Sequence, residues 1–322
     1  MSPARPLVIQ TEHLDASCAA WLAERCNLHQ CAPEEGARFE QLLAEASGLV
    51  IRTYTRVDAA LLDRAPRLKV VGRAGVGLDN VDLEACASRG VTVVHTPDAN
   101  TVAVVEYVWA LMLDALRPRP SLSEPLALTE WKSLRRDCIA SHQLADLTLG
   151  LLGFGRVGQR MARIAAAFDT RVIYNDLLEI PESRRSGATP VPLDTLLRDN
   201  HVLSLHVDGR ATNRHFIDAG KLGRCRDEML LVNASRGFVI DDRALAAFLA
   251  ARPAARAVLD VHEPEPFDAE SPLVGMANVR LLPHLGAATA TAHRNMSWVV
   301  RDVWSVLNGE AAEFAAVPAT TR

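Results

Sequence analysis

The segment that most constrains the fold is 147–158, LTLGLLGFGRVG, in which an apolar run leads directly into three spaced glycines. The apolar run is typical of a buried strand, and the QRMARIAAAF that follows is a helix-forming stretch. In such a strand–turn–helix unit Gly153 permits a tight turn, Gly155 lets the backbone approach a pyrophosphate, and Gly158 packs helix against strand. The start of the helix supplies free N–H groups and a positive potential. The segment predicts a dinucleotide-binding turn, although an ordinary strand–turn–helix without a ligand shares the local pattern.

An acidic residue lies where such a turn requires one. The candidate strand 171–176, RVIYND, ends on Asp176, about 20 residues after the glycines. A carboxylate at this point holds the ribose hydroxyls and repels a 2′-phosphate, which favours NAD over NADP. Arg184 and Arg185 follow closely and keep NADP as the alternative.

Short apolar strands alternate with helix-length segments along the whole chain, which predicts a parallel α/β architecture. At 322 residues, two domains are expected. The candidate strands fall into two blocks, and the six of the second block match a full doubly wound nucleotide-binding sheet. The first block comprises residues 7–9, 48–52, 69–72 and 91–95, and the second 147–153, 171–176, 202–206, 229–233, 257–261 and 279–282. We therefore predict two doubly wound parallel-sheet domains.

A long apolar helix is expected between the two blocks. Asn100 and Thr101 are typical of a helix start, and the helix runs to about Leu116, before the turn-rich RPRPSLSEP. Its apolar residues point almost all round, so it must be covered on every side. It is either a core helix linking the domains or a homodimer interface through residues 101–116.

The composition excludes several classes of protein. The chain is 49% hydrophobic and 23% charged, with a formal net charge of −4, which does not favour binding to nucleic acid or anionic lipid. No apolar segment is long enough to span a membrane or to act as a secretory signal. The six cysteines are scattered, and neither they nor the histidines have the spacing of metal ligands. We expect an untargeted cytoplasmic protein without a metal site.

Beyond these features, several motifs occur together and in order. The sequence resembles the D-isomer-specific 2-hydroxyacid dehydrogenase family over nearly its whole length, and within that family the phosphoglycerate dehydrogenases most closely. The segments that carry the resemblance are GLVIR (48–52), VGRAGVGLDNVD (71–82), TP (96–97) with NT (100–101), NASRG (233–237) with Asp241, LDVHEPEP (259–266) and PHLG (283–286).

The resemblance implies a catalytic set of Arg236, Glu265 and His284. A guanidinium pins the substrate carboxylate and polarises the carbonyl, and an imidazole of near-neutral pKa exchanges the proton of the hydroxyl. Glu265 then orients the imidazole and stabilises its protonated form. His206, also at a strand end, is the rival base, but the residues after it depart from the family pattern.

The resemblance also implies a Rossmann cofactor domain, residues 99–288, inserted into a flavodoxin-like substrate domain made of residues 1–98 and 289–322. NAD is the expected cofactor. Besides the three glycines and Asp176, its implied contacts are Arg156, Val157, Val207, Ala234, Asp260 and Gly286. Of these, Val207 and Ala234 are implied to line the nicotinamide side of the cofactor, and Asp260 to meet the nicotinamide carboxamide.

The implied substrate-binding residues are Arg52, Arg73, Gly75, Val76, Gly77 and Asn100. The loop 73–78 can present consecutive backbone N–H groups to a carboxylate, unless it is a simple glycine turn. Arg52 and Arg73 suit a phosphate on the substrate, unless both are solvated surface residues. We therefore expect 3-phosphoglycerate first, with glyoxylate, hydroxypyruvate or another small 2-keto acid as the alternative.

Some segments depart from the family pattern. Ala99 replaces a usual glycine, 141–144 (SHQL) replaces a GxEL-like entry to the cofactor domain, and Asp208 and Arg210 lie where a PLTP-like stretch is usual. The chain ends without the regulatory domain of longer phosphoglycerate dehydrogenases, so serine feedback is not expected. A non-catalytic NAD sensor, like the corepressors built on this fold, is the alternative from another class, because fold alone does not establish catalysis.

Overall fold

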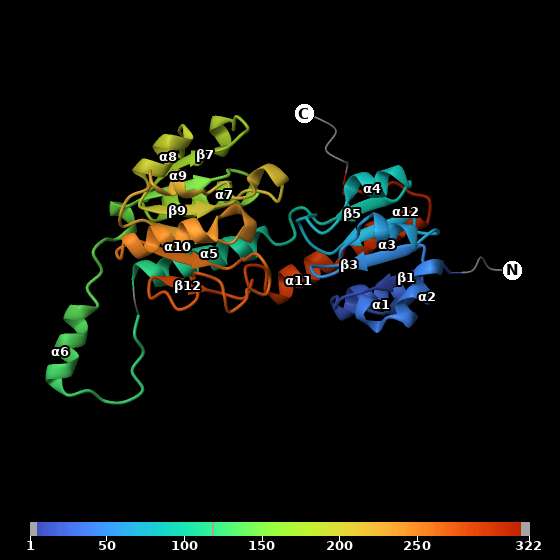
Figure 1. Ribbon diagram of the computed structural model, residues 1–322, viewed down its shortest axis with the longest axis horizontal. Helices are drawn as coiled ribbons and strands as arrows, with labels where there is room; N and C mark the ends of the chain where they lie inside the picture. The colour runs from blue at the N-terminus through green and yellow to red at the C-terminus, as the bar shows by residue number, and fades with distance from the viewer. Residues whose placement is uncertain (1–4, 118, 317–322) are drawn as a thin grey trace. The chain divides into compact units, whose positions relative to one another are not determined.

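The structure is a computed structural model, and it describes residues 5–117 and 119–316. The chain forms two compact units. Unit 1 comprises the residues up to Asn100 together with those from Ala287 onward, and unit 2 is the continuous segment Thr101–Gly286 (Figure 1). The sequence-based boundaries, 98/99 and 288/289, lie two residues from these crossings, which fall after residues 100 and 286.

Unit 1 is built on a sheet with the order β13-β5-β4-β3-β1-β2. All neighbouring strands pair in parallel except β13 with β5. Its elements are β1 (Leu7–Gln10), α1 (Ala16–Ala23), β2 (Asn27–Gln30), α2 (Ala37–Glu45), β3 (Gly48–Ile51), α3 (Ala59–Asp63), β4 (Val70–Arg73), α4 (Leu83–Ser88), β5 (Thr92–His95), α11 (Ala290–Ser297), α12 (Val300–Leu307) and β13 (Ala315–Ala316).

Both faces of this sheet are covered, so alternate residues of each strand enter different cores. Ile9 and Val71 pack with α2, α3 and α4 on one face. Val8 and Val70 pack with α1 and α12 on the other. A strand buried on both faces has no polar alternation, which is why the first-block strands read as apolar runs.

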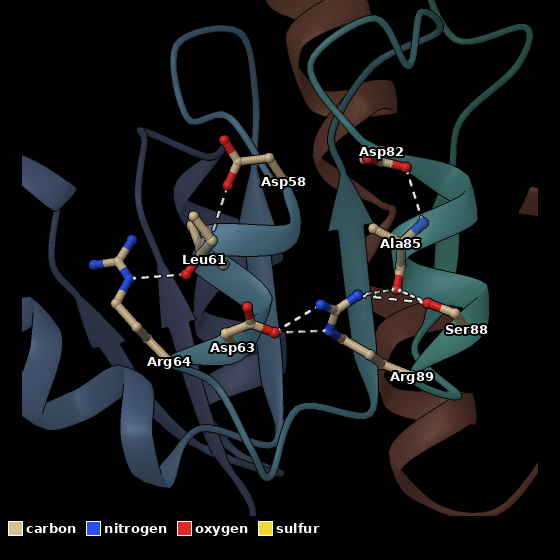
Figure 2. Close-up of polar contacts among 9 residues, drawn as sticks. Asp58, Leu61, Asp63, Arg64, Asp82, Ala85, Ser88 and Arg89 are labelled. Carbon is tan, nitrogen blue, oxygen red and sulfur yellow. Dashed lines mark hydrogen bonds and ion pairs between the residues drawn. The ribbon is translucent and has the colours of Figure 1, made fainter.

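Side-chain caps begin the short helices of unit 1. Asp58 accepts the N–H of Leu61 at the start of α3 (3.0 Å), and Asp82 accepts that of Ala85 at the start of α4 (2.8 Å; Figure 2). The Arg89 guanidinium then reaches from the end of α4 to the Asp63 carboxylate at 2.6 Å, joining the two helices.

Unit 2 is built on a sheet with the order β12-β11-β10-β9-β6-β7-β8, parallel throughout. Its elements are α5 (Thr101–Leu116), α6 (Leu128–Asp137), β6 (Thr148–Leu152), α7 (Arg156–Ala167), β7 (Arg171–Asn175), β8 (Thr189–Pro190), α8 (Leu193–Asp199), β9 (Val202–Leu205), α9 (Ala219–Leu222), β10 (Leu230–Asn233), α10 (Asp242–Ala251), β11 (Arg256–Leu259) and β12 (Val279–Leu281). The central order is that of a Rossmann sheet, with the reversal of direction between β6 and β9.

Helix α5 lies in the core of unit 2. Val105, Val108 and Met112 are fully or almost fully buried and belong to the same cluster as Met161 of α7. The core-helix interpretation therefore accounts for most of its apolar surface. Helix α6, in contrast, buries none of its residues.

The predicted fold class, two doubly wound α/β domains, is confirmed. Each of the ten predicted strands is found, with ends within two residues of those expected. Three strands were not predicted: β2 because its sequence NLHQ is polar, and β8 and β13 because each is two residues long. In the described part of the chain, no helix has the length and apolar character needed to cross a membrane.

Candidate functional site

The glycine-rich turn of unit 2 lies between β6 and α7, as predicted. Gly153 has φ = +89°, and a Cβ there would lie 2.4 Å from the carbonyl oxygen of His206. At Gly155, the N-cap residue just before α7, an added Cβ meets nothing within 4 Å. Arg156 and Val157 form the first turn of the helix, so their N–H groups lie at its positive end. The open space over Gly155 beside these donors fits a pyrophosphate.

Asp176 follows β7 and faces this turn. One carboxylate oxygen accepts the N–H of Phe154 at 2.5 Å, and the other accepts that of Leu178 at 2.8 Å. The acid is thereby fixed beside the glycines, where a ribose would follow a bound pyrophosphate. Arg185, one of the two residues that kept NADP open, donates to the carbonyl of Ile180 (2.8 Å).

The loop after β9 packs against the glycine turn and carries Val207. Before it, the ring of His206 hydrogen-bonds Ser204 (2.9 Å), and burial lowers its pKa to about 4. A histidine that resists protonation this strongly is a poor proton shuttle at neutral pH. After it, Asp208 and Arg210, the departure from the family pattern, form a two-bond ion pair with each other (2.5 and 2.7 Å).

Arg236 lies in the turn after β10, and a buried asparagine shapes that turn. Asn233 donates to the carbonyl of Arg236 (2.8 Å) and accepts from the backbone and hydroxyl of Ser235 (3.0 and 2.8 Å). Ala234, the proposed nicotinamide neighbour, is half-buried in the same turn. The Arg236 side chain donates to the carbonyl of Ser235 at 2.7 Å.

The turn after β10 and the loop after β11 are in direct contact. A Cβ on Gly237 would lie 2.0 Å from the backbone of His262, so only glycine allows this approach. His262 is itself structural, because its Nε2 bonds the carbonyl of Leu282 at 2.7 Å. The contact brings the Arg236 turn against the loop that carries Glu265.

Glu265 and His284 form a hydrogen-bonded pair. The Nδ1 of His284 lies 2.8 Å from one carboxylate oxygen of Glu265, and the other oxygen accepts the N–H of His262 at 2.9 Å. Burial pushes the pKa of Glu265 upward, but the bonds from His284 and His262 outweigh it, so the pKa lies below its ordinary value. The carboxylate is therefore ionised, and it selects the imidazole tautomer with its proton on Nδ1.

His284 sits in a strained turn that Asp260 holds. The φ of His284 is +56°, a conformation uncommon for a residue with a side chain. Asp260, 1% exposed, accepts the next two backbone N–H groups, those of Leu285 and Gly286, at 2.8 Å each. Tyr107 of α5 donates its hydroxyl to the same carboxylate at 3.2 Å. The role predicted for Asp260, contact with the nicotinamide amide, stays a prediction; the observed bonds make it the support of the His284 turn.

The residues predicted to bind substrate lie in unit 1, after neighbouring strands of its sheet. Arg52 follows β3 and Arg73 ends β4. The Arg73 side chain covers Gly75, where an added Cβ would overlap the guanidinium. The carbonyl of Gly75 accepts the N–H of Thr96 at 3.1 Å. The carbonyl of Val76 is hydrogen-bonded to the His95 ring at 3.0 Å.

Gly77 completes that loop in a half-buried position, and Asn100 ends the first of the two segments of unit 1. The structure thus places three predicted groups together in unit 2: the glycine turn, the Arg236 turn and the Glu265–His284 pair. The predicted substrate residues gather at the strand ends of unit 1.

Sequence reasoning missed four residues that shape these loops. Asn233 and Tyr107 support unit 2 as described above. In unit 1, Glu12 accepts backbone N–H groups after β3, and Asn80 donates to the carbonyls of Arg52 (3.0 Å) and Thr55 (2.7 Å). Asn233 and Asn80 lay in recognised motifs, NASRG (233–237) and VGRAGVGLDNVD (71–82), whereas Tyr107 and Glu12 did not. Among residues 5–117 and 119–316, no group of three or more His, Cys, Asp or Glu side chains could hold a metal ion.

Comparison with known proteins agrees with this geometry. The family model described as "D-isomer specific 2-hydroxyacid dehydrogenase, NAD binding domain" matches residues 109–286. D-3-phosphoglycerate dehydrogenase of Archaeoglobus fulgidus is 34% identical over 83% of this chain, which spans about half (51%) of that relative's length. (S)-sulfolactate dehydrogenase of Chromohalobacter salexigens is 36% identical over 92% of this chain and 96% of its own.

Solved structures give the same result. A glyoxylate reductase from Paecilomyes thermophila superposes with a TM-score of 0.83 at 26% identity, covering 99% of this chain and 100% of that one. The motif order, the fold and the matched family model all agree. The chain therefore belongs to the D-isomer-specific 2-hydroxyacid dehydrogenase family of NAD-dependent oxidoreductases.

Proposed function

We propose that this chain transfers a hydride between NAD and a 2-hydroxy or 2-keto acid, with 3-phosphoglycerate as the first substrate. The observation that carries the proposal is the Glu265–His284 pair at 2.8 Å, in a loop packed against the Arg236 turn. It combines a proton shuttle, its orienting carboxylate and a cation at the carboxyl edge of a Rossmann sheet.

The residues divide the work by their chemistry. Because Nδ1 of His284 is held by Glu265, Nε2 is the atom that takes the hydroxyl proton in oxidation and returns it in reduction. Arg236 binds the substrate carboxylate with its fork of donors and stabilises charge on the C2 oxygen. The glycine turn and Asp176 would hold NAD, which would supply the hydride acceptor. Asp260 keeps the His284 turn in place.

The decisive test is turnover, followed by nicotinamide absorbance. The panel contains 3-phosphoglycerate, 3-sulfolactate, glyoxylate, hydroxypyruvate and pyruvate, each in the appropriate direction. His284→Gln keeps hydrogen bonding but cannot shuttle the proton, so kcat should fall roughly 10²- to 10⁴-fold. The dissociation constant of NADH, measured by fluorescence, should stay unchanged.

Each alternative has its own outcome. Preference for glyoxylate or hydroxypyruvate keeps the mechanism and replaces the substrate. A wild type that binds NADH yet turns over none of these acids favours the sensor. Phosphoglycerate turnover that is unaffected by Arg52→Ala and Arg73→Ala contradicts the assignment of these arginines to the phosphate.

We further propose a homodimer through the 101–116 region and the segment after it. Val102 is 44% exposed on α5, and Leu128, Trp131 and Ile139 are 67, 45 and 76% exposed. Exposed apolar side chains gathered along one segment favour an interface. Sedimentation should show a dimer for the wild type and a monomer for Trp131→Arg; a monomeric wild type contradicts the proposal.

Cytoplasmic location also stays a proposal. All six cysteines are free thiols, and five of them are buried, an arrangement that suits a reducing compartment. Fractionation of the producing cells should recover the chain with cytoplasmic markers, and recovery with secreted or envelope proteins would contradict it.

A further inference from the structure

The loops after β1 and β3 in unit 1 flank the point where the strand order reverses. In the sheet order β5-β4-β3-β1-β2, strand β2 lies on one side of β1, whereas β3, β4 and β5 follow one another on its other side. The strand order therefore reverses between β1 and β3. Sheets of this order open a crevice at the carboxyl ends of the two strands at the reversal, and ligands bind there. The residues at this place are 11–15 after β1 and 52–55 after β3.

A single carboxylate joins these two loops. Glu12 accepts the backbone N–H groups of all four residues after β3, at 2.9–3.2 Å: Arg52, Thr53, Tyr54 and Thr55. Its oxygens are therefore used by the backbone. The Arg52 guanidinium, in the part of the chain that the structure describes, forms no ion pair and donates one long bond to the carbonyl of His13 (3.4 Å).

Two histidines from different elements meet beside this arginine. The rings of His13, after β1, and His293, on α11, are stacked with centroids 5.4 Å apart and planes 24° from parallel. Two contacts hold helix α11 against the loop that follows β1. The Ser297 hydroxyl accepts the N–H of Asp15 (2.9 Å), and the Arg294 guanidinium lies 3.6 Å from the Asp15 carboxylate. The stack is therefore held from both sides.

Charged groups of both signs surround the stack: Arg52 and Arg294 are cationic, and Glu12 and Asp15 are carboxylates. Burial lowers the pKa of Arg52, opposed by Glu12 and Tyr54. The pKa of His293 is lowered, first by burial and then by the charges of Arg52 and His13, whereas the carboxylate of Asp15 raises it. Arg52 and His293 are half-buried while His13 is exposed, so a ligand reaches the cluster from solvent. Partly buried cations that destabilise one another become more stable when an anion binds between them.

We propose that Arg52, His13 and His293 form a binding site for a tetrahedral oxyanion, phosphate or sulfonate, carried by the substrate beyond its hydroxyl carbon. This inference rests on the proposed 2-hydroxy acid dehydrogenase function and adds two specificity-determining histidines to it. Arg73 belongs to the neighbouring loop and lies over Gly75.

The test compares substrates with and without the oxyanion in the full-length enzyme. His13→Asn and His293→Gln each remove a proton-binding ring while keeping a polar side chain. Each should raise KM for 3-phosphoglycerate or 3-sulfolactate about tenfold, the effect of losing one charge-assisted contact. The kcat for these acids and the KM for glyoxylate should not change. His29→Gln, on β2 of the same unit, is the matched control and should behave as wild type.

The pH dependence supplies a second readout. A sulfonate keeps a single negative charge over the pH range in which histidines titrate. A phosphate changes its own charge near pH 6, so its titration would overlap that of the histidines. KM for 3-sulfolactate should therefore fall as pH is lowered below the ordinary histidine pKa, because the anion favours the imidazolium form of His293, whose pKa burial, Arg52 and His13 lower. In the double variant His13→Asn/His293→Gln this fall should be clearly smaller than in the wild type.

The outcomes separate this inference from the proposed function. If the variants use phosphorylated and sulfonated acids as well as wild type does, the histidine site is overturned and the dehydrogenase function stands. If wild type reduces glyoxylate but neither uses nor is inhibited by either oxyanion acid, both the histidine site and the phosphoglycerate assignment fall. If no acid is turned over and 3-phosphoglycerate does not bind, the function and the inference fail together.

Discussion

Each of the two units uses one carboxylate to organise a loop at the carboxyl edge of its sheet, but the settings differ. In unit 2 Asp260 is 1% exposed and accepts two backbone N–H groups and the Tyr107 hydroxyl. In unit 1 Glu12 is half-buried and accepts four backbone N–H groups. The count of bonds is larger at Glu12, yet the burial is much greater at Asp260.

This difference teaches that burial, more than the number of bonds, decides what such a carboxylate contributes. Donors left unpaired away from water keep their full desolvation penalty, whereas water replaces a lost partner at a half-exposed loop. Asp260 holds the turn of His284, which has a positive φ and whose side chain is the proposed proton shuttle. Glu12 holds a loop that presents Arg52 to solvent.

The largest effect is expected for Asp260→Ala. It leaves the N–H groups of Leu285 and Gly286 and the Tyr107 hydroxyl without their acceptor, which should cost about 3 kcal/mol of unfolding free energy. Urea unfolding followed by circular dichroism measures this loss. Because Asp260 positions His284, kcat should also fall, and Asp260→Asn should recover part of both. A stable Asp260→Ala enzyme with wild-type kcat would break the comparison.

A smaller effect is expected for Glu12→Ala. Water can reach the four freed N–H groups, so the loss should be about 1 kcal/mol despite the larger number of bonds. Glu24→Ala, whose side chain is 73% exposed, is the matched control and should lie within about 0.5 kcal/mol of wild type. A greater loss for Glu12→Ala than for Asp260→Ala would reverse the argument.

The smallest effect concerns pH, and it has opposite signs for two acids of unit 2. Burial raises the pKa of Asp260 above its ordinary 3.8, so folding favours its protonated form. The stabilisation that comes from this pKa shift is complete below pH 3.8 and is lost as pH rises through the folded-state pKa. The pKa of Glu265 is lowered, so folding favours its ionised form. The stabilisation that comes from this shift is complete above pH 4.5 and is lost as pH falls through the folded-state pKa.

Acid-range unfolding of matched variants checks these signs. The stability of wild type relative to Asp260→Asn should decrease with rising pH, and that relative to Glu265→Gln should increase. Parallel slopes for the two variants would show that burial does not separate these carboxylates.

The sequence was most informative where a function needs several residues close together in the chain. The turn of Gly153, Gly155 and Gly158 could be predicted because its geometry is local to one strand–turn–helix unit. The buried strands could be predicted because both faces of each sheet are covered, which makes each strand a continuous apolar run. The end of the run then marks the end of the strand. Arg236, Glu265 and His284 were located by their motifs rather than by periodicity.

What could not be predicted depends on contacts between distant segments. Tyr107 lies 153 residues from Asp260, and Glu12 lies 40 residues from Arg52, without a local pattern that marks either pair. The stack of His13 on His293 joins the two ends of the chain, and only the folded unit reveals it. The short strand β2 was missed because its polar sequence gives no burial signal.

The discontinuity of unit 1 has a consequence for synthesis. Val299, Val300 and Val303 belong to the core on the α12 face of its sheet, and they leave the ribosome after the whole of unit 2. Unit 2, one uninterrupted stretch, is complete earlier. A nascent chain therefore carries a finished nucleotide-binding unit while one face of the amino-terminal sheet, covered there by α1, still lacks α12. Chaperone protection is needed most in that interval, and a truncation just after residue 286 should expose that apolar face permanently.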